Sequence, residues 1–245
     1  MFMLLGCLSL YAADNDLTTK QITIKLEKAG TLPDRIASSR KYKVTNLKII
    51  GEINGTDLRM IREMAGHNFN GNSTDGKLSV LDLSEAKIVK GGDCYLNNGY
   101  DYTSNDVIGS RAFLGCSVLT SLTLPDGVTS IYFDAFAGCS GLTSIYVYAE
   151  KVPKIDSNAF KGVDAKKYTL YVPMGTRDDY CASDFGDYFE NIVEFEATGI
   201  DKTTTSTDVE EVVRYSVNGQ RLSAPTKGLN IVKYSDGTVR KVVVK

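Results

Sequence analysis

The chain has 245 residues, of which 42% are hydrophobic, and a formal net charge of −2 at pH 7. A chain of this length can form one elongated domain with a small appendage, and its hydrophobic content is sufficient for a packed core. The nearly balanced charge provides no general attraction to polyanions, so we expect no nucleic-acid partner.

An apolar run opens the chain. Residues 2–12 are mostly apolar and lead into Ala13-Asp14, although no Lys or Arg precedes them. The run is too short to span a membrane and is typical of a secretory signal with its cleavage site. We therefore interpret residues 1–13 as a signal-peptide-like segment and expect the protein to be secreted or held at the outer cell surface. Two alternatives stay open: a buried N-terminal segment, or a lipid on Cys7 of Leu4-Leu5-Gly6-Cys7, which would be the expected form of membrane attachment.

The next segment predicts an N-terminal cap. Residues 17–28 alternate as in an opening strand, and residues 44–49 have the apolar spacing of a second strand. A helix is expected from Thr56-Asp57, which are helix-capping residue types, to Gly66, which is a natural stop. Its apolar face would be formed by Leu58, Ile61, Met64 and Ala65. Residues 78–83 then read Leu-x-x-Leu-x-Leu, which predicts another strand.

An insertion interrupts this pattern between residues 88 and 107. It is rich in Gly and Asn and carries Tyr95, Tyr100 and Tyr102. An insertion in a repeat protein often lies on its binding side, but a polar surface loop with locally packed tyrosines is the alternative. Calcium binding is a further option, although the aspartates lack the close alternate spacing of a calcium loop. These aspartates are Asp93, Asp101 and Asp106.

An internal repeat follows the insertion. When residues 108–124 are written over residues 131–147, a shift of 23, nine of the seventeen positions are identical. A period in the twenties is typical of a leucine-rich solenoid, in which each repeat forms one coil. Leu119, Leu122 and Leu124 would point inward from a short strand, and the threonines and serines between them would point outward.

The return path of each coil closes the core from the other side. We expect Ile108, Ala112 and Phe113 to be buried there, with Gly115 at the turn. One coil buries too little apolar surface to offset the entropy of ordering its backbone. Further coils and atypical end caps must therefore lie on both sides of the repeat.

The chain continues with a last coil and a C-terminal cap. Residues 155–162 repeat the return path with a shift of 24, and residues 168–172 supply a strand. Thr176 with Asp179 resembles a capping box that opens a short helix through Ala182, and residues 191–195 form a closing strand. The predicted fold class is thus an α+β, mostly β solenoid over residues 14–196, with parallel short strands and caps at both ends.

Two phrases carry a resemblance to a known family. AFAGCSGLTSI at residues 135–145 and LYVP at residues 170–173 resemble the BspA-like leucine-rich-repeat family, over about residues 47–195. The resemblance implies a secreted or surface protein, common in anaerobic gut and oral bacteria, that acts in adhesion or ligand binding, often to host proteins. The family has no shared catalytic residues, so none is assigned.

The remaining residues predict a linker and a small β module. Residues 197–211 are polar and lack periodicity, as linkers do. In residues 212–245, Asn218-Gly219 and Asp236-Gly237 separate alternating runs and predict antiparallel hairpins. The module resembles C-terminal modules of surface proteins from the same bacteria, including sorting tails read by an outer-membrane secretion machine. That resemblance rests on residues 218–220, 228–232 and 241–245.

The sequence contains few of the residues that form catalytic or metal sites, with one histidine and five cysteines. His67 is the sole histidine and follows the predicted helix, so we expect a surface residue and no catalytic triad. Cys116 and Cys139 occupy equivalent positions of neighbouring coils, where parallel side chains do not face each other as a disulfide requires. We expect two buried free thiols there and make no pairing for Cys94 or Cys181. We therefore predict that the protein is not an enzyme and that it binds no cofactor and no metal.

We expect a monomeric, non-catalytic protein that binds a host or bacterial surface protein through the outward face of its strands. Hydroxyls and tyrosines suit adaptable recognition. The candidate ligand-binding residues are Asp82, Thr120, Thr123, Thr143, Tyr146, Thr169 and Tyr171. Glycan binding is the alternative function, although the chain has no Trp. An ordinary solvated face is also open, because Thr and Ser favour strands for steric reasons.

Overall fold

The computed structural model describes residues 17–162, 164, 166–195, 211–216, 221–222, 224–234 and 239–244. The expected signal segment, including Cys7, lies outside these residues, as does all of the expected linker except residue 211. The chain divides into two compact units, residues 1–198 and 199–245. Each unit is described by itself.

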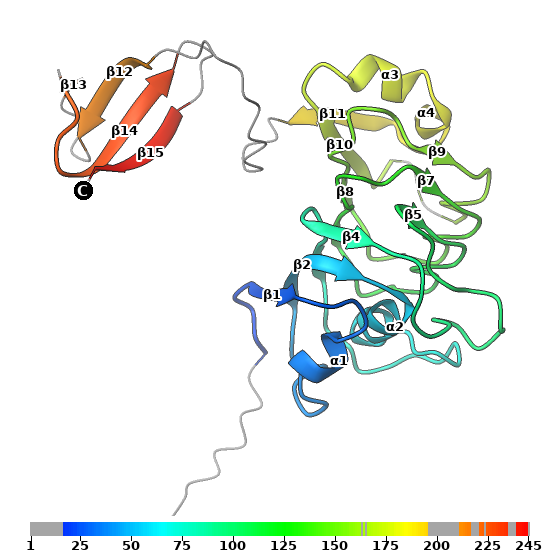
Figure 1. Ribbon diagram of the computed structural model, residues 1–245. Helices are drawn as coiled ribbons and strands as arrows, with labels where there is room; N and C mark the ends of the chain where they lie inside the picture. The colour runs from blue at the N-terminus through cyan, green and yellow to red at the C-terminus, as the bar shows by residue number, and fades with distance from the viewer. Residues whose placement is uncertain are drawn as a thin grey trace, which may run out of the picture. The chain divides into compact units, whose positions relative to one another are not determined.

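A parallel sheet runs through the first unit (Figure 1). Every pairing in it is parallel. In sheet order its strands are β1 (Ile22–Leu26), β2 (Asn46–Ile53), β3 (Val80–Asp82), β6 (Ser121–Thr123), β8 (Ser144–Tyr146), β10 (Thr169–Pro173) and β11 (Asn191–Phe195), and β4 (Ala86–Ile88) pairs with β2. Leu81, Leu122 and Ile145 lie in one register row and are buried, as the apolar spacing of the coils predicts.

A second parallel sheet lies on the return path of the coils. Its strands are β5 (Val107–Ile108), β7 (Ser130–Ile131) and β9 (Lys154–Ile155). The buried residues of both sheets belong to one hydrophobic cluster. Successive coils therefore share a core that no single coil encloses, which is the arrangement that leucine-rich repeats require.

The phenylalanines of the return path form a continuous row. The Phe113 and Phe136 rings stack with centroids 5.5 Å apart, and those of Phe136 and Phe160 stack at 4.9 Å. All three side chains are buried. Phe160 also contacts Phe185 and Phe189 of the C-terminal cap, so the row ends against the residues that close the stack.

The turn between return path and strand depends on glycine. Gly115 has φ +74°, a left-handed conformation that glycine adopts without strain. The ring of His67 lies against this position and leaves no room for a side chain, since a Cβ there would lie 2.7 Å from the imidazole. His67 is consequently half-buried and not the open surface residue that we expected.

The N-terminal cap contains α1 (Leu32–Arg35) and α2 (Gly55–Met64). The expected helix α2 is present, but the assignment of Thr56 as its capping residue is wrong. Asn54 holds the extended backbone of the N-cap and accepts from the Thr56 N–H, while Asp57 accepts from the Asn54 N–H. Asp57 also accepts from the N–H groups of Gly30 and Leu32, so one buried carboxylate joins both helices.

The C-terminal cap contains α3 (Arg177–Cys181) and α4 (Asp184–Tyr188). Helix α3 lies where we expected a helix, but the capping box of Thr176 and Asp179 is wrong. The Thr176 hydroxyl donates to the carbonyl of Pro173 and caps no N–H of α3, whereas Glu194 accepts from the Arg177 N–H at the start of the helix. Helix α4 is capped by Ser183, a feature that the sequence did not lead us to expect.

The second unit is an antiparallel sheet in the order β13-β12-β14-β15. Its strands are β12 (Glu211–Ser216), β13 (Arg221–Leu222), β14 (Gly228–Tyr234) and β15 (Val239–Val244). Arg214 on β12 donates to Asn230 on β14 at 3.2 Å, and both are buried. The expected hairpin turns at residues 218–219 and 236–237 lie outside the described residues.

Replacing Phe136 by Ala tests the shared core. Because its ring stacks on a phenylalanine of each neighbouring coil, the change should lower the free energy of unfolding by about 3–5 kcal/mol in urea denaturation. Phe133→Ala, at a side chain 38% exposed, should cost about 1 kcal/mol or less. Equal losses for the two variants would contradict the continuous row.

Candidate functional site

The outward face of the large sheet changes character along the stack. One register row crosses all seven strands of the main path and points away from the core. In order it contains Thr23, Lys48, Asp82, Thr123, Tyr146, Tyr171 and Val193. The row is therefore charged in the N-terminal coils and aromatic in the C-terminal ones.

An aromatic cluster covers the C-terminal part of this face. We define it as Tyr146, Tyr148, Tyr171 and Phe195. The Tyr146 and Tyr171 rings are stacked, with centroids 4.3 Å apart and planes within 8° of each other. Phe195 meets Tyr146 at 5.7 Å and Tyr148 at 5.0 Å with its ring almost perpendicular to theirs. All four side chains are partly exposed, so the cluster is a packed surface feature.

The phenol groups of Tyr146 and Tyr148 remain neutral near pH 7. Partial burial raises the pKa of Tyr146, and the neighbouring Tyr171 adds to the shift. Burial likewise raises the pKa of Tyr148, and the carboxylate of Asp82 contributes to that shift. Tyr146 and Tyr148 thus offer uncharged hydroxyl donors at the edge of apolar rings, a combination common at protein interfaces.

Asp82 belongs to a charged group beside the cluster. The Lys48 ammonium lies 3.3 Å from the Asp82 carboxylate and 2.7 Å from that of Glu85. These contacts, led by the hydrogen bond to Glu85, raise the pKa of Lys48. Asp82 also accepts from the backbone and hydroxyl of Ser84. Two carboxylates against one ammonium leave this part of the face acidic.

Two of the predicted site residues take part in a hydroxyl ladder. Thr120 donates to the carbonyl of Ser79 at 3.0 Å, and Thr143 donates to the carbonyl of Thr120 at 3.1 Å. Ser79 donates to the carbonyl of Thr45 in the same way. Each hydroxyl therefore bonds the preceding coil, which gives these residues a role in stacking. Ligand binding by Thr120 and Thr143 stays a prediction.

The other predicted residues lie on strands of the same face. Thr123 stands in the row beside Tyr146, and Thr169 pairs with Ser144 two residues along the strands. The structure thus brings Tyr146, Tyr171 and Thr123 together. Sequence reasoning did not select Tyr148 and Phe195, although strand alternation leads from Tyr146 to Tyr148, and from Val193 to Phe195 on β11.

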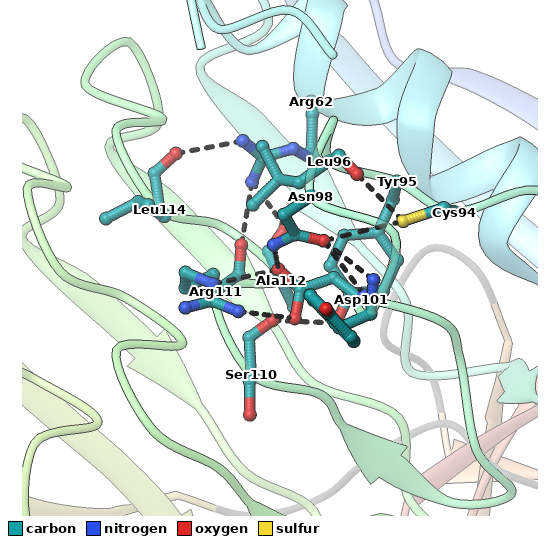
Figure 2. Close-up of polar contacts among 11 residues, drawn as sticks. Arg62, Cys94, Tyr95, Leu96, Asn98, Asp101, Ser110, Arg111, Ala112 and Leu114 are labelled. Carbon is teal, nitrogen blue, oxygen red and sulfur yellow. Dashed lines mark hydrogen bonds and ion pairs between the residues drawn. The ribbon is translucent and has the colours of Figure 1, made fainter. Parts of the chain in front are cut away.

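The insertion is anchored by its own polar contacts (Figure 2). Asp101 receives two hydrogen bonds from the Arg111 guanidinium, at 2.8 and 3.0 Å. Asp101 is buried, and Arg111 holds it against the first repeat coil. Both carboxylate oxygens of Asp101 already accept hydrogen bonds from Arg111, which argues against Asp101 as a calcium ligand. Among the described residues, no three His, Cys, Asp or Glu side chains gather as a metal site would require.

Side chains also cap the first repeat coil. In the second repeat coil, the carbonyls of Phe133, Ala135 and Ala137 accept hydrogen bonds from backbone N–H groups of the first repeat coil. The equivalent carbonyls of the first repeat coil have no preceding repeat coil whose N–H groups could donate to them. There the Tyr95 hydroxyl donates to Ser110, and the buried Arg62 donates to Ala112 and Leu114 (Figure 2). Tyr95 is therefore a packed structural tyrosine, whereas Tyr100 and Tyr102 are exposed.

The buried thiols offer no reactive group. Cys116 and Cys139 are both free and buried, as expected. Burial raises the pKa of Cys116 to about 11 and that of Cys139 well above its ordinary value. The Cys139 thiol donates to the carbonyl of Phe113 at 3.0 Å.

His67 has a lowered pKa, because burial and the nearby Arg62 disfavour its charged form.

The comparisons with known proteins agree with this geometry. A family model described as BspA type leucine rich repeat region, in six copies, matches residues 102–215. Residues 102–215 are therefore similar to leucine-rich repeats of the BspA type, which supports the resemblance that the sequence phrases indicated. Such repeats serve protein interaction or binding at surfaces, their proteins are typically secreted or surface-located, and the repeat family is generally non-catalytic. A search of curated proteins gave no match. None of the described helices has the length and apolar character to cross a membrane.

Alkylation tests the state of the cysteines. Treated with iodoacetamide in mildly alkaline buffer, the folded chain should be labelled at the exposed Cys181, whereas Cys116 and Cys139 should react only after denaturant is added. The reason is that burial blocks access to both thiols and keeps them protonated. Peptide mapping by mass spectrometry gives the answer; labelling of Cys139 as fast as Cys181, or a Cys116–Cys139 disulfide, would contradict the buried ladder.

Proposed function

We propose that this chain is a non-catalytic protein-binding module of the cell surface or the secreted fraction, and that the aromatic cluster is its main recognition site. The observation that carries the proposal is the stacked pair Tyr146–Tyr171 with Phe195 set against its edge. Clustered, partly exposed tyrosines are typical of protein interfaces, because they supply large contact area at low entropic cost.

The ring geometry favours a protein over a glycan. Sugar recognition uses the open face of an aromatic ring, yet Tyr146 and Tyr171 cover a face of each other. The stack therefore covers one face of each ring, while the ring edges and hydroxyl groups stay available for a ligand. Edges and hydroxyls fit the mixed apolar and hydrogen-bonding surface of a protein. The acidic group of Asp82 and Glu85 beside the cluster favours a partner with a basic side chain next to apolar ones.

Binding to extracellular matrix tests this site. The full chain should bind a decellularised matrix from cultured host cells, and Tyr146→Ala with Tyr171→Ala should weaken binding at least about tenfold, as the loss of central aromatic anchors does. Binding is measured as a saturation isotherm, with unfolding curves for each variant.

Thr129→Val is the control on the return path, away from this face. It removes a hydroxyl that donates to the carbonyl of Asp106, so it should lower stability by about 1 kcal/mol or less and leave binding unchanged. If the two tyrosine substitutions left the isotherm unaltered, or if Thr129→Val weakened binding equally, the aromatic cluster would not be the recognition site.

We further propose that the second unit is a sorting tail that delivers the solenoid to the cell surface. Support comes from its sequence resemblance to such tails and from its separate antiparallel sheet. Lipidation of Cys7 is an alternative route to the surface.

Truncation distinguishes these routes. In a host with an outer-membrane secretion machine of this kind, the full chain should reach the surface of intact cells and a chain that ends at Phe195 should not, because the sorting signal is lost. Antibody staining of unpermeabilised cells is the measurement. Equal surface staining of both chains would refute the sorting role and leave the solenoid's binding function unaffected.

A further inference from the structure

Four exposed aromatic residues are linked to the Asp101–Arg111 ion pair by the chain or by backbone hydrogen bonds. We call them the insertion patch: Tyr100, Tyr102, Tyr132 and Phe133, which are 84%, 51%, 47% and 38% exposed. Tyr100 and Tyr102 flank Asp101 in the chain. Phe133 accepts a backbone hydrogen bond from Arg111, and Tyr132 donates one to Ile108. The ion pair thus ties the insertion to the coil that carries Tyr132 and Phe133.

The insertion patch lies on a different side of the solenoid from the aromatic cluster. Its residues belong to the insertion and to the return path next to β7, whereas the cluster projects from β8, β10 and β11 or just beyond them. The shared hydrophobic core includes buried residues of both sheets. A ligand on one surface therefore leaves the other accessible.

The insertion holds a fixed conformation by many contacts. Asn98 accepts from the N–H groups of Tyr100 and Asp101, which forms a tight turn at the tip. Asn97 binds the carbonyl of Phe69 and the side chain of Asn70. Thr103 binds the carbonyls of Val89 and Gly91, which closes the base. The exposed tyrosines thus stand on a preorganised loop, and preorganisation reduces the entropy lost on binding.

The chemistry of the loop selects the class of partner. Residues 89–106 contain three aspartates and one lysine, and Arg111 pairs with one of the aspartates, so the loop has no excess positive charge to attract polyanions such as nucleic acid and anionic lipid. Tyr, Asn, Gly and Ser dominate its tip, the composition of loops that recognise protein surfaces. Tyr95 already serves the stack, but Tyr100 and Tyr102 contribute nothing to the core.

We infer that the insertion patch is a second protein-binding surface, independent of the aromatic cluster, in which Tyr100 and Tyr102 are the central contacts and the Asp101–Arg111 pair positions them. Its partner is a polypeptide that presents apolar side chains and hydrogen-bond acceptors to the tyrosine rings and hydroxyls.

A phage-displayed library of random peptides serves as the probe, because it presents many combinations of apolar side chains and hydrogen-bond acceptors at once. Peptides selected on the immobilised full chain should include clones whose affinity falls about tenfold or more with Tyr100→Ser and Tyr102→Ser together. The matched control is Met174→Ser, which removes a side chain of similar exposure elsewhere and should leave these clones unaffected. Both variants should unfold at the wild-type denaturant concentration, because the altered side chains are exposed.

Asp101→Asn separates positioning from contact. It keeps both rings but weakens the grip of Arg111, so the same clones should bind about threefold to tenfold less tightly. Amide hydrogen exchange around residues 97–103 should rise in this variant, a change that the two serine substitutions at the exposed rings should not reproduce to the same degree.

Several outcomes would overturn the inference. These are a selection that yields no peptide, clones that are indifferent to Tyr100 and Tyr102, and clones that all depend on Tyr146 and Tyr171. The last result would leave the proposed function of the aromatic cluster intact. Vesicles of phosphatidylcholine and phosphatidylserine form a separate arm: tyrosine-dependent sedimentation with them would replace the protein partner by a membrane. Self-association lost in the double variant would replace it by a second copy.

Discussion

In-register stacking of the coils is the constraint on which this structure depends. Strands β3, β6 and β8 have three residues each, too few to form a stable pair alone. Equivalent side chains of successive coils must therefore support one another directly. The phenylalanine row does so on the return path, and the hydroxyl ladder does so beside the strands. Both features repeat because each coil offers the next the same surface.

The same register converts small sequence changes into surface properties. Position 123 is Thr, and its equivalents in the next two coils are Tyr146 and Tyr171. Because neighbouring strands lie about 4.8 Å apart, two tyrosines at equivalent positions must stack. The stacked pair Tyr146–Tyr171 thus arises from a substitution at one outward repeat position, while the inward leucines and the ladder hydroxyls keep the fold. This separation allows a repeat protein to vary its ligand without loss of its core.

Periodic features could be predicted from the sequence, because equivalent residues reveal their shared environment. The shift of 23 residues predicts burial of Phe113 and Phe136 together, and the free thiols at Cys116 and Cys139 follow from the same argument. Features that depend on single contacts could not be predicted in this way. Both Asn54 and Thr56 have helix-capping side chains, and only the backbone conformation at Asn54 decides between them. The pairing of Asp101 with Arg111 likewise leaves no periodic trace.

The first repeat coil shows why the non-periodic contacts are needed. In a coil in the middle of the stack, the return-path carbonyls accept from backbone N–H groups of the preceding coil. The first repeat coil instead follows helix α2, whose backbone N–H groups are already engaged within the helix. Buried carbonyls without donors would cost stability. Arg62 from α2 and Tyr95 from the insertion supply the missing donors. The insertion is therefore part of the transition from cap to repeat, and only the exposed rings of Tyr100 and Tyr102, which satisfy no group of the stack, are free to serve recognition.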